Sequence, residues 1–208
     1  MLTVVCVLKS GGDFDEDYVF ALRDGVEKHL TIPHKFVCYT DKPIKGISIR
    51  LLSEDLDGWF AKFEVFKEVG PALYLDLDTV VTGEVDSLGR DIEEAGEAFW
   101  MLEAFSPARK WASGIMAWTG DWSQLVSHCK RYAGLYFTDQ ECIAKALKGN
   151  GVTPRLIRRN YYHIYSYKHH CLEGLPSGAK IVCFHGKPRP RDVKEEWNPW
   201  PLRLSGKQ

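Results

Sequence analysis

The first half of the chain alternates between short apolar runs and amphipathic segments. Three apolar runs have the length and composition of strands that are buried on both faces of a sheet: residues 3–8, 35–39 and 47–52. After the first run, apolar residues at helical spacing predict a helix that Asp15 or Asp17 caps. Residues 59–69 predict a second helix, which ends at Gly70-Pro71. Strands that alternate with helices are typical of a parallel α/β sheet.

A fourth apolar run, residues 72–77, leads into two carboxylates, Asp76 and Asp78. Side chains at positions i and i+2 of a strand point to the same face of the sheet. Two carboxylates on one face repel each other and are costly to desolvate unless a cation lies between them. The D-x-D spacing therefore predicts a divalent-metal site at the C-terminal end of a central strand, where open α/β sheets bind their ligands.

The second half of the chain is more mixed. Strands are predicted at residues 98–102, 115–118 and 181–184, and helices at residues 121–132 and 138–147. Thr138 and Glu141 form the capping-box pattern of a helix start. We predict an α/β fold with a mixed, mainly parallel central sheet flanked by helices. One domain is expected over residues 1–190, and a C-terminal tail over residues 191–208 is expected to pack on or near it.

Composition narrows the function classes. The chain has 208 residues and a formal net charge of -1, so no general attraction to nucleic acid or to anionic membranes is expected. No apolar stretch is long enough to span a bilayer, and the apolar N-terminus has the pattern of a strand rather than of a signal peptide. The six cysteines include no C-x-x-C pair, which favours a reducing, cytoplasmic setting.

A second candidate group follows the last predicted strand, as the adjacent residues His185, Gly186 and Lys187. A neutral imidazole can complete the ligand set of a metal, glycine lets the backbone approach a phosphate closely, and lysine offers a point charge. Carboxylates with one imidazole suit Mn²⁺ (or Mg²⁺) better than Ca²⁺. Lys62, in the helix that precedes the D-x-D run, is placed to reach a diphosphate.

Two enzyme classes place D-x-D after a strand. In the first, the carboxylates hold a metal ion against the diphosphate of a nucleotide-sugar. The second is the haloacid-dehalogenase-like phosphohydrolases, in which Asp76 would be the nucleophile and a later acidic pair would complete the metal site. Only Asp121 offers a start to such a pair. A third alternative is a protein that binds nucleotide-sugars without catalysis.

The order of the motifs resembles the GT-A glycosyltransferases, and most closely family 8, which includes glycogenin and the bacterial lipopolysaccharide galactosyltransferases. The resemblance covers the chain to about Pro190 and rests on five elements: Lys62 followed by Phe66, Leu73 to Asp78, Ser113-Gly114, Asp139-Gln140, and His185 to Pro188. It implies a GT-A fold and metal-dependent transfer of a hexose, with retention of configuration, from a UDP-sugar donor to a saccharide or other hydroxyl acceptor.

The resemblance also implies a role for each matching residue. The implied manganese ligands are Asp76, Asp78 and His185. Contacts to the diphosphate or the donor sugar would come from Lys62, Gly186 and Lys187. The nucleoside would lie near Leu8, Lys9 and Tyr18. The donor sugar would be lined by Ser113, Gly114, Asp139 and Gln140, of which Asp139 and Gln140 would lie nearest the reacting carbon.

The chain departs from the family pattern at two places, which indicates a divergent member. Ala112 stands where the family has asparagine, and His185, Gly186 and Lys187 are adjacent where the family has spacers. If transfer instead inverts the configuration, a base is required, and Glu103 or Asp139 is the candidate.

Three further groups are more ambiguous. An arginine set is interpreted as a solvated face rather than an anion site: Arg155, Arg158, Arg159, Arg189 and Arg191. Trp197 and Trp200 are interpreted as anchors of the tail rather than as sugar-stacking residues. Residues 161–170 are unusually rich in tyrosine and histidine, which fits part of an acceptor groove without specifying a mechanism.

Overall fold

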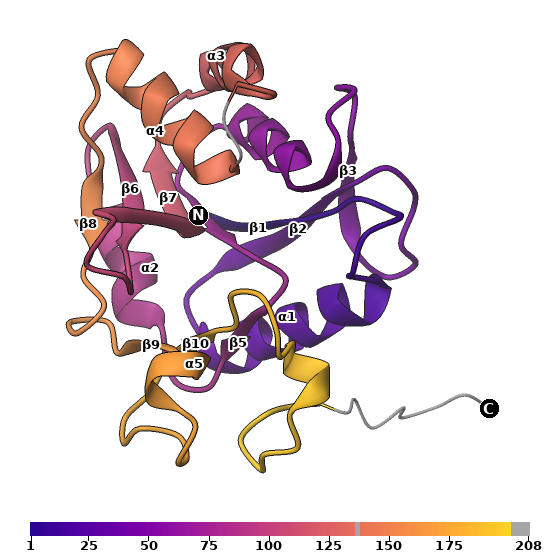
Figure 1. Cartoon of the computed structure of the whole chain (residues 1–208), viewed down its shortest axis with the longest axis vertical. Coiled ribbons are helices and arrows are strands. Elements are labelled where there is room, and N and C mark those ends of the chain that lie inside the picture. The colour runs from indigo at the N-terminus through magenta and orange to yellow at the C-terminus, as the bar shows by residue number, and fades with distance from the viewer. Residues whose placement is uncertain (136–137, 201–208) are drawn as a thin grey trace.

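A central sheet organises the computed structural model, which describes residues 1–135 and 138–200 (Figure 1). Within those residues the sheet has seven strands in the order β3-β2-β1-β4-β7-β6-β8. In that order the strands are Ser48–Leu51, His34–Thr40, Leu2–Leu8, Ala72–Leu75, Trp111–Thr119, Ala98–Glu103 and Arg155–Ile157. The strands β3, β2, β1 and β4 run parallel, β7 is antiparallel to both β4 and β6, and β8 is parallel to β6.

A second, three-stranded sheet has the order β5-β10-β9, with bounds Thr79–Val81, Ile181–Cys183 and Ile164–Ser166. Strand β10 is antiparallel to β5 and parallel to β9. The register places Thr79 opposite Cys183 and Cys183 opposite Ser166, so these three residues form one row across the sheet. The short helices α5 (Tyr167–His170) and η2 (Pro190–Asp192) follow β9 and β10.

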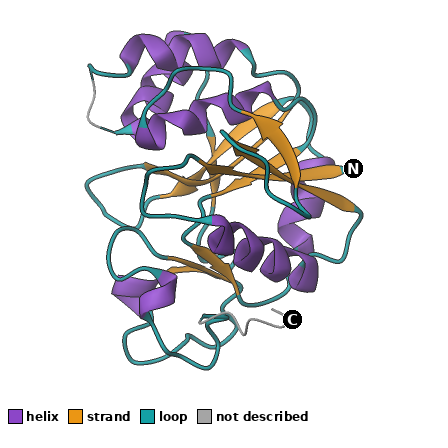
Figure 2. Ribbon diagram, turned by 90° about the vertical axis from the view of Figure 1, so that its right-hand side faces the viewer, coloured by secondary structure: helices purple, strands orange, loops and turns teal. Residues whose placement is uncertain are grey.

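Helices cover both faces of the central sheet (Figure 2). On one face, α1 (Glu16–His29) and α2 (Asp86–Glu93) pack against side chains such as Val4 and Cys6 of β1. On the other, η1 (Gly58–Lys67), α3 (Gln124–Tyr132) and α4 (Asp139–Gly149) pack against a core that includes Val5. Successive residues of β1 thus enter opposite cores, because strand side chains alternate between faces. This two-sided burial explains why β1 is apolar at every position except Thr3.

The structure confirms the predicted fold class and most elements of the first half. Asp15 is the N-cap of α1 and accepts a hydrogen bond from the backbone N–H of Asp17. Thr138 caps α4, and its hydroxyl group accepts a hydrogen bond from the backbone N–H of Glu141. The segment predicted as a helix at 59–69 is a 3₁₀ helix, and the helix predicted from Asp121 begins at Gln124. Asp121 instead accepts a hydrogen bond from Ser123 N–H in the preceding turn.

The strand predicted over residues 72–77 is the main correction to the fold. Strand β4 ends at Leu75, and the chain then turns into β5 of the other sheet. The backbone N–H of Asp76 donates to the carbonyl group of Gly114, and Thr79 N–H donates to the carbonyl group of Asp76. Asp76 and Asp78 therefore lie on a turn between two sheets, and not on one face of a continuous strand.

The described part of the tail packs against the N-terminal region. The ring of Trp200 lies 4.7 Å from that of Tyr18, and Asn198 donates to the carbonyl groups of Pro190 and Val193. Residues 201–208 of the predicted tail lie outside the described residues. None of the helices in the described ranges has the length and hydrophobicity that crossing a bilayer requires.

Candidate functional site

A cavity of about 730 Å³ lies at the carboxyl ends of β1 and β4. Its wall comes from the loop after β1, the start of η1, the β4–β5 turn, the start of α4 and the segment after β10. It contains six of the residues that the sequence predicts for the site: Leu8, Lys9, Lys62, Asp76, Asp78 and Asp139. Segments far apart in the chain thus meet at the sheet edge where α/β folds bind ligands.

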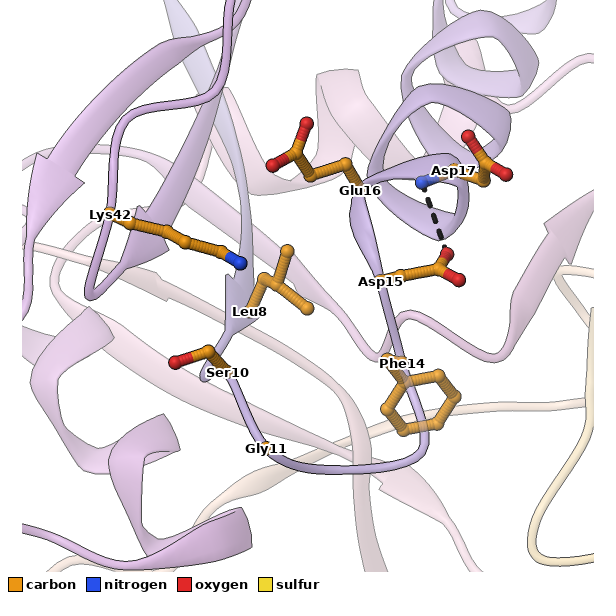
Figure 3. Close-up of a pocket in the computed structure, with 8 residues that line it drawn as sticks. All are labelled: Leu8, Ser10, Gly11, Phe14, Asp15, Glu16, Asp17 and Lys42. Atoms are coloured by element: carbon orange, nitrogen blue, oxygen red, sulfur yellow. Dashed lines mark hydrogen bonds between the residues drawn. The ribbon is translucent and has the colours of Figure 1, made fainter.

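A smaller hollow of about 320 Å³ adjoins the cavity at the start of α1 (Figure 3). The two share the loop residues Leu8, Ser10, Gly11 and Phe14. Figure 3 shows the side chain of Lys42 reaching towards Leu8 from the opposite wall, while Asp15 points back to the backbone of Asp17.

A buried ion network centres on Lys62. The Lys62 Nζ atom lies 2.6 Å from Asp139 Oδ2 and 2.9 Å from Asp76 Oδ1, and the residue is only 7% exposed. The Ser113 hydroxyl group donates to Asp139 Oδ2 at 2.8 Å, and the Tyr74 hydroxyl group donates to Asp76 Oδ1 at 2.5 Å. Every member of the network therefore has a polar partner, which a buried charge requires.

The network shifts the pKa values of its two carboxyl groups in opposite directions. Burial alone would lower the pKa of Lys62, but the charges of Asp139 and Asp76 outweigh it and raise that pKa. Burial acts to raise the pKa of Asp139, but the ion pair with Lys62 and the hydrogen bonds from Lys62 and Ser113 bring it below the usual value. For Asp76, burial and the neighbouring Asp139 carboxylate outweigh Lys62, so its pKa is raised. The structure therefore holds Asp139 as an anion and makes the charge on Asp76 costly.

Gly114 supports the first carboxylate of the D-x-D pair. Its carbonyl group accepts the Asp76 N–H at 2.9 Å, and a Cβ atom at Gly114 would lie 3.2 Å from Asp76 Oδ2. A larger residue would therefore displace the carboxylate. Ser113 and Gly114, which the resemblance places along a donor sugar, lie behind Asp139 and Asp76 and are not among the residues that line the cavity.

Arg189 binds the second carboxylate. Its Nη1 atom donates to Asp78 Oδ2 at 2.6 Å, its Nη2 atom lies 3.1 Å from Asp13 Oδ2, and its guanidinium group stacks 4.6 Å from the ring centre of Phe14. Burial and the nearby Asp76 carboxylate nevertheless raise the pKa of Asp78 to about 7, against the opposing effect of Arg189 and Lys62. The interpretation of Arg189 as part of a solvated face was wrong, since its side chain is only 18% exposed.

The adjacent residues His185, Gly186 and Lys187 are exposed and do not line the cavity. The Nε2 atom of His185 lies 2.7 Å from the hydroxyl group of Ser166, and its ring stacks on Phe105. Burial, then the charge of Lys168, lowers the pKa of His185 and favours the neutral ring. His185 nevertheless lies close to the turn, because the Phe184 N–H donates to the carbonyl group of Asp78 at 2.9 Å.

Two further predicted residues lie away from the cavity wall. Tyr18 is buried with its ring between those of Phe14 and Trp200, so the described structure gives it a packing role. Gln140 is half-buried in the first turn of α4, directly after Asp139. Tyr74 lines the cavity and binds Asp76, and no motif in the sequence points to it. The alternation of strand side chains could have indicated it, because it places Tyr74 on the same face as Asp76.

The comparisons with known proteins identify the fold. No family model matches the sequence, and no curated protein matches it. Among solved structures, the chain is similar to the glycosyltransferase GlyE of Streptococcus pneumoniae TIGR4, with a TM-score of 0.67 and 14% sequence identity. The match covers 93% of this chain and 56% of that protein, so the chain spans about half the length of its structural relative. The likeness confirms a GT-A-like α/β fold, and membership of family 8 stays a prediction.

The carboxylate pair fits a divalent ion in its chemistry. Asp76 and Asp78 line one cavity, offer the oxygen ligands that Mn²⁺ and Mg²⁺ prefer, and have raised pKa values that a further cation would bring down. The described residues contain no group of three His, Cys, Asp or Glu side chains already arranged around a metal position. Asp76 and Asp78 thus line the same cavity, and His185 lies beside the turn that carries them but outside the cavity wall.

Proposed function

We propose that the protein is a glycosyltransferase that moves a hexose from a UDP-sugar to a hydroxyl group of a saccharide or similar acceptor. The observation that carries the proposal is the Lys62 network: a buried lysine held between Asp76 and Asp139 in a cavity at the carboxyl ends of β1 and β4. The GT-A-like fold supports it, because folds of this type present their ligand sites at this sheet edge.

Two side chains supply positive charge towards a donor diphosphate. The ammonium group of Lys62 faces the cavity from η1, and the guanidinium group of Arg189 faces it from the other wall. Asp76 and Asp78 would hold Mn²⁺ or Mg²⁺, with His185 as the third ligand that the resemblance implies. When bound, the ion would supply positive charge that offsets the negative charge developing on the leaving diphosphate.

The reaction forms a bond between the acceptor oxygen and the anomeric carbon and breaks the bond from that carbon to the diphosphate. The bonding electrons leave with the diphosphate, and the proton of the acceptor hydroxyl group passes to a diphosphate oxygen. Asp139 Oδ2 already accepts from Lys62 and Ser113, so Asp139 suits the orientation of Lys62 better than the removal of a proton. Glu103, the other candidate base, accepts from Arg159 N–H and pairs with Arg158. Both observations favour the retaining outcome.

The phosphohydrolase alternative has less support. It requires a second acidic pair beside the nucleophile, and the candidate Asp121 is exposed in the turn before α3 and does not line the cavity. Hydrolysis of p-nitrophenyl phosphate in the presence of Mg²⁺ would revive it.

Calorimetry of UDP binding tests the proposal. We expect Mn²⁺ to tighten UDP binding at least tenfold relative to a chelator, and we expect Asp78→Ala to abolish this gain. Asp24→Ala is the matched control, because Asp24 forms only an exposed pair with Arg23 in α1. Equal UDP affinity with Mn²⁺ and with chelator would remove the bridging role of the metal.

Turnover then separates an enzyme from a binding protein. The wild-type chain and Asp24→Ala should hydrolyse UDP-glucose or UDP-galactose slowly when no acceptor is present, and Asp78→Ala should not. Tight binding without hydrolysis or transfer across a panel of acceptors would instead identify a non-catalytic nucleotide-sugar binder.

A further inference from the structure

A cluster of rings and cations lies on the surface beside His185. We call it the ring platform and define it by five residues: Phe105, Arg159, Lys168, His169 and His170. They come from the β6–β7 connection, the segment after β8, and helix α5. Lys168, His169 and His170 belong to the tyrosine- and histidine-rich stretch at 161–170, to which the proposed function gives no role.

The rings of Phe105, His185 and His169 form one stack with interplanar angles of 21° and 29°, and the His170 ring is tilted by 55° from Phe105 and by 68° from His169. The ring of Phe105 lies 6.1 Å from that of His170, and the ring of His185 lies 5.7 Å from both Phe105 and His169. His169 and His170 are exposed, and Phe105 is half-buried. Because His185 lies between Phe105 and His169 in the stack, the exposed His169 at its end offers the ring face against which the apolar face of a sugar packs.

The cations of the platform lack acidic partners. Within residues 1–135 and 138–200, neither Arg159 nor Lys168 forms an ion pair, whereas the adjacent Arg158 pairs with Glu103 at 3.7 Å. The Arg159 guanidinium group stacks 5.1 Å from the ring centre of Phe105, and its buried Nε atom has no hydrogen-bond partner. An arginine held in place by a ring but without an acid is available to a carboxylate or phosphate group of a ligand.

The ammonium group of Lys168 lies against the backbone of Gly186. Gly186 has a φ of +82°, and a Cβ atom at this position would lie 3.1 Å from Lys168 Nζ. A side chain at position 186 would therefore press on the ammonium group of the half-buried Lys168.

The small sheet places the platform next to the cavity. Thr79, Cys183 and Ser166 form one row, so the residues just beyond that row lie along a single edge: Asp78, Phe184 (which His185 follows) and Tyr167, the first residue of helix α5. Neighbouring strands are about 4.8 Å apart, so α5 begins about 10 Å from the Asp78 backbone. Figure 1 shows β5, β10, β9 and α5 side by side. A molecule on the platform would thus have its near end at the D-x-D turn.

We propose that the ring platform is the acceptor subsite and that it takes an anionic saccharide, one that carries a carboxylate or a phosphate group. The assignment rests on the proposed function, since it makes the platform the place from which the acceptor hydroxyl group reaches the donor. The His169 ring packs against the face of the sugar, Arg159 binds the anion through its terminal N–H groups, and Lys168 adds a point charge. This preference for an anionic saccharide comes from the charges of the platform alone, because the chain as a whole carries a formal net charge of -1.

Ligand-observed NMR titrations of the full chain without nucleotide test the subsite. The probes are methyl glucoside, methyl glucuronide, glucose 6-phosphate and inorganic phosphate. At least one anionic sugar should bind about tenfold more tightly than methyl glucoside, and which one does identifies carboxylate or phosphate as the anion. Arg159→Gln should remove this preference, and Arg158→Gln, the matched control, should keep it. Equal binding of neutral and anionic sugars, equal effects of the two variants, or binding of inorganic phosphate as tight as that of glucose 6-phosphate would overturn the proposal.

A second measurement separates this proposal from the proposed function. Arg159→Gln should bind UDP with Mn²⁺ as tightly as the wild-type chain does, because Arg159 does not line the cavity. UDP binding without anionic-sugar binding would refute the subsite alone. Sugar binding without UDP binding under any condition would refute the proposed function, and the acceptor role of the platform with it.

Discussion

Replacing Lys62 by methionine tests whether the buried network holds the cavity together. Methionine has a similar length and no charge, so the substitution removes the ammonium group with little change in volume. It leaves the carboxylates of Asp76 and Asp139 facing each other without the cation that lies 2.9 Å and 2.6 Å from them. Asp139 would then be held largely shielded from water, with a side chain 14% exposed, whereas Asp76, at 31%, keeps part of its contact with the cavity.

The size of the effect follows from these distances. At an effective dielectric constant of about 20, a unit charge pair at 2.6–2.9 Å is worth about 6 kcal/mol. Desolvation of the buried ions offsets much of this gain, and breaking a buried ion pair costs about 3–5 kcal/mol in measured cases. For a chain of 208 residues, a loss of this size corresponds to a decrease in melting temperature of about 6–20 °C.

Urea unfolding followed by circular dichroism measures the loss at pH 7.5. Lys180→Met is the control, because Lys180 forms a more exposed pair with Glu84 at 3.2 Å, and its loss should cost at most about 1 kcal/mol. Adding Asp139→Asn to Lys62→Met should restore part of the stability, since it removes one of the two unpaired charges. A Lys62→Met chain within about 1 kcal/mol of the wild type would refute the argument that the network is tightly coupled and desolvated.

Three other changes test separate features. Gly89→Ala should not bring the gain of about 1 kcal/mol that alanine gives at an open helix position, because its Cβ atom would lie 2.7 Å from Ile32 Cδ1. Urea unfolding should show it no more stable than the wild type, Gly96→Ala, which meets no atom within 4 Å, should be nearly neutral, and a gain of about 1 kcal/mol for Gly89→Ala would refute the overpacking. Burial acts to raise the pKa of Glu64, but backbone N–H groups and the Lys67 ammonium group outweigh it and lower that pKa, so the stabilising effect of Glu64 should be full above about pH 4.3 and fade as the pH falls further. The difference in melting temperature between wild type and Glu64→Gln should therefore narrow below that pH, and a constant difference would contradict this. Arg189→Gln removes the guanidinium group that binds Asp78, so Asp78 becomes available to a metal ion. Calorimetry should then show severalfold tighter Mn²⁺ binding to the nucleotide-free chain. Weaker binding would show that Arg189 does not compete with the ion for Asp78.

The sequence predicts elements well where one periodicity runs long enough. The buried strands β1 and β2, helix α1 and the capped start of α4 are clear from spacing and capping residues. The break after Leu75 is not visible, because the run from Ala72 to Val81 contains no glycine or proline to mark it while its hydrogen-bond partner changes from β7 to β10. Strands of three residues, such as β8 and β9, are too short to establish a period.

Some residues of the candidate site can be predicted from the sequence and others cannot. Asp76, Asp78 and Lys62 are found from motif and position, because each is adjacent to an element that the pattern identifies. Arg189 is separated from Asp78 by 111 positions, and nothing in its local sequence distinguishes it from the other arginines. Pairings of this kind depend on how the second sheet folds back to the first, which no local periodicity encodes.

The charges that line the cavity give a physical reason for a metal ion in the proposed reaction. The charged residues of its wall are Lys9, Asp13, Asp57, Lys62, Asp76, Asp78, Asp139 and Arg189. Five carboxylates thus face three cations, and the pKa of Asp78 is raised by burial and then by one of these carboxylates, Asp76. A diphosphate entering this wall would meet further negative charge, and a divalent cation would cancel the excess. The ring platform has the opposite charge balance, because its five residues include two cations and no acid. The cavity would therefore attract an anionic donor through a bound ion. The ring platform would attract an anionic acceptor directly, through Arg159 and Lys168.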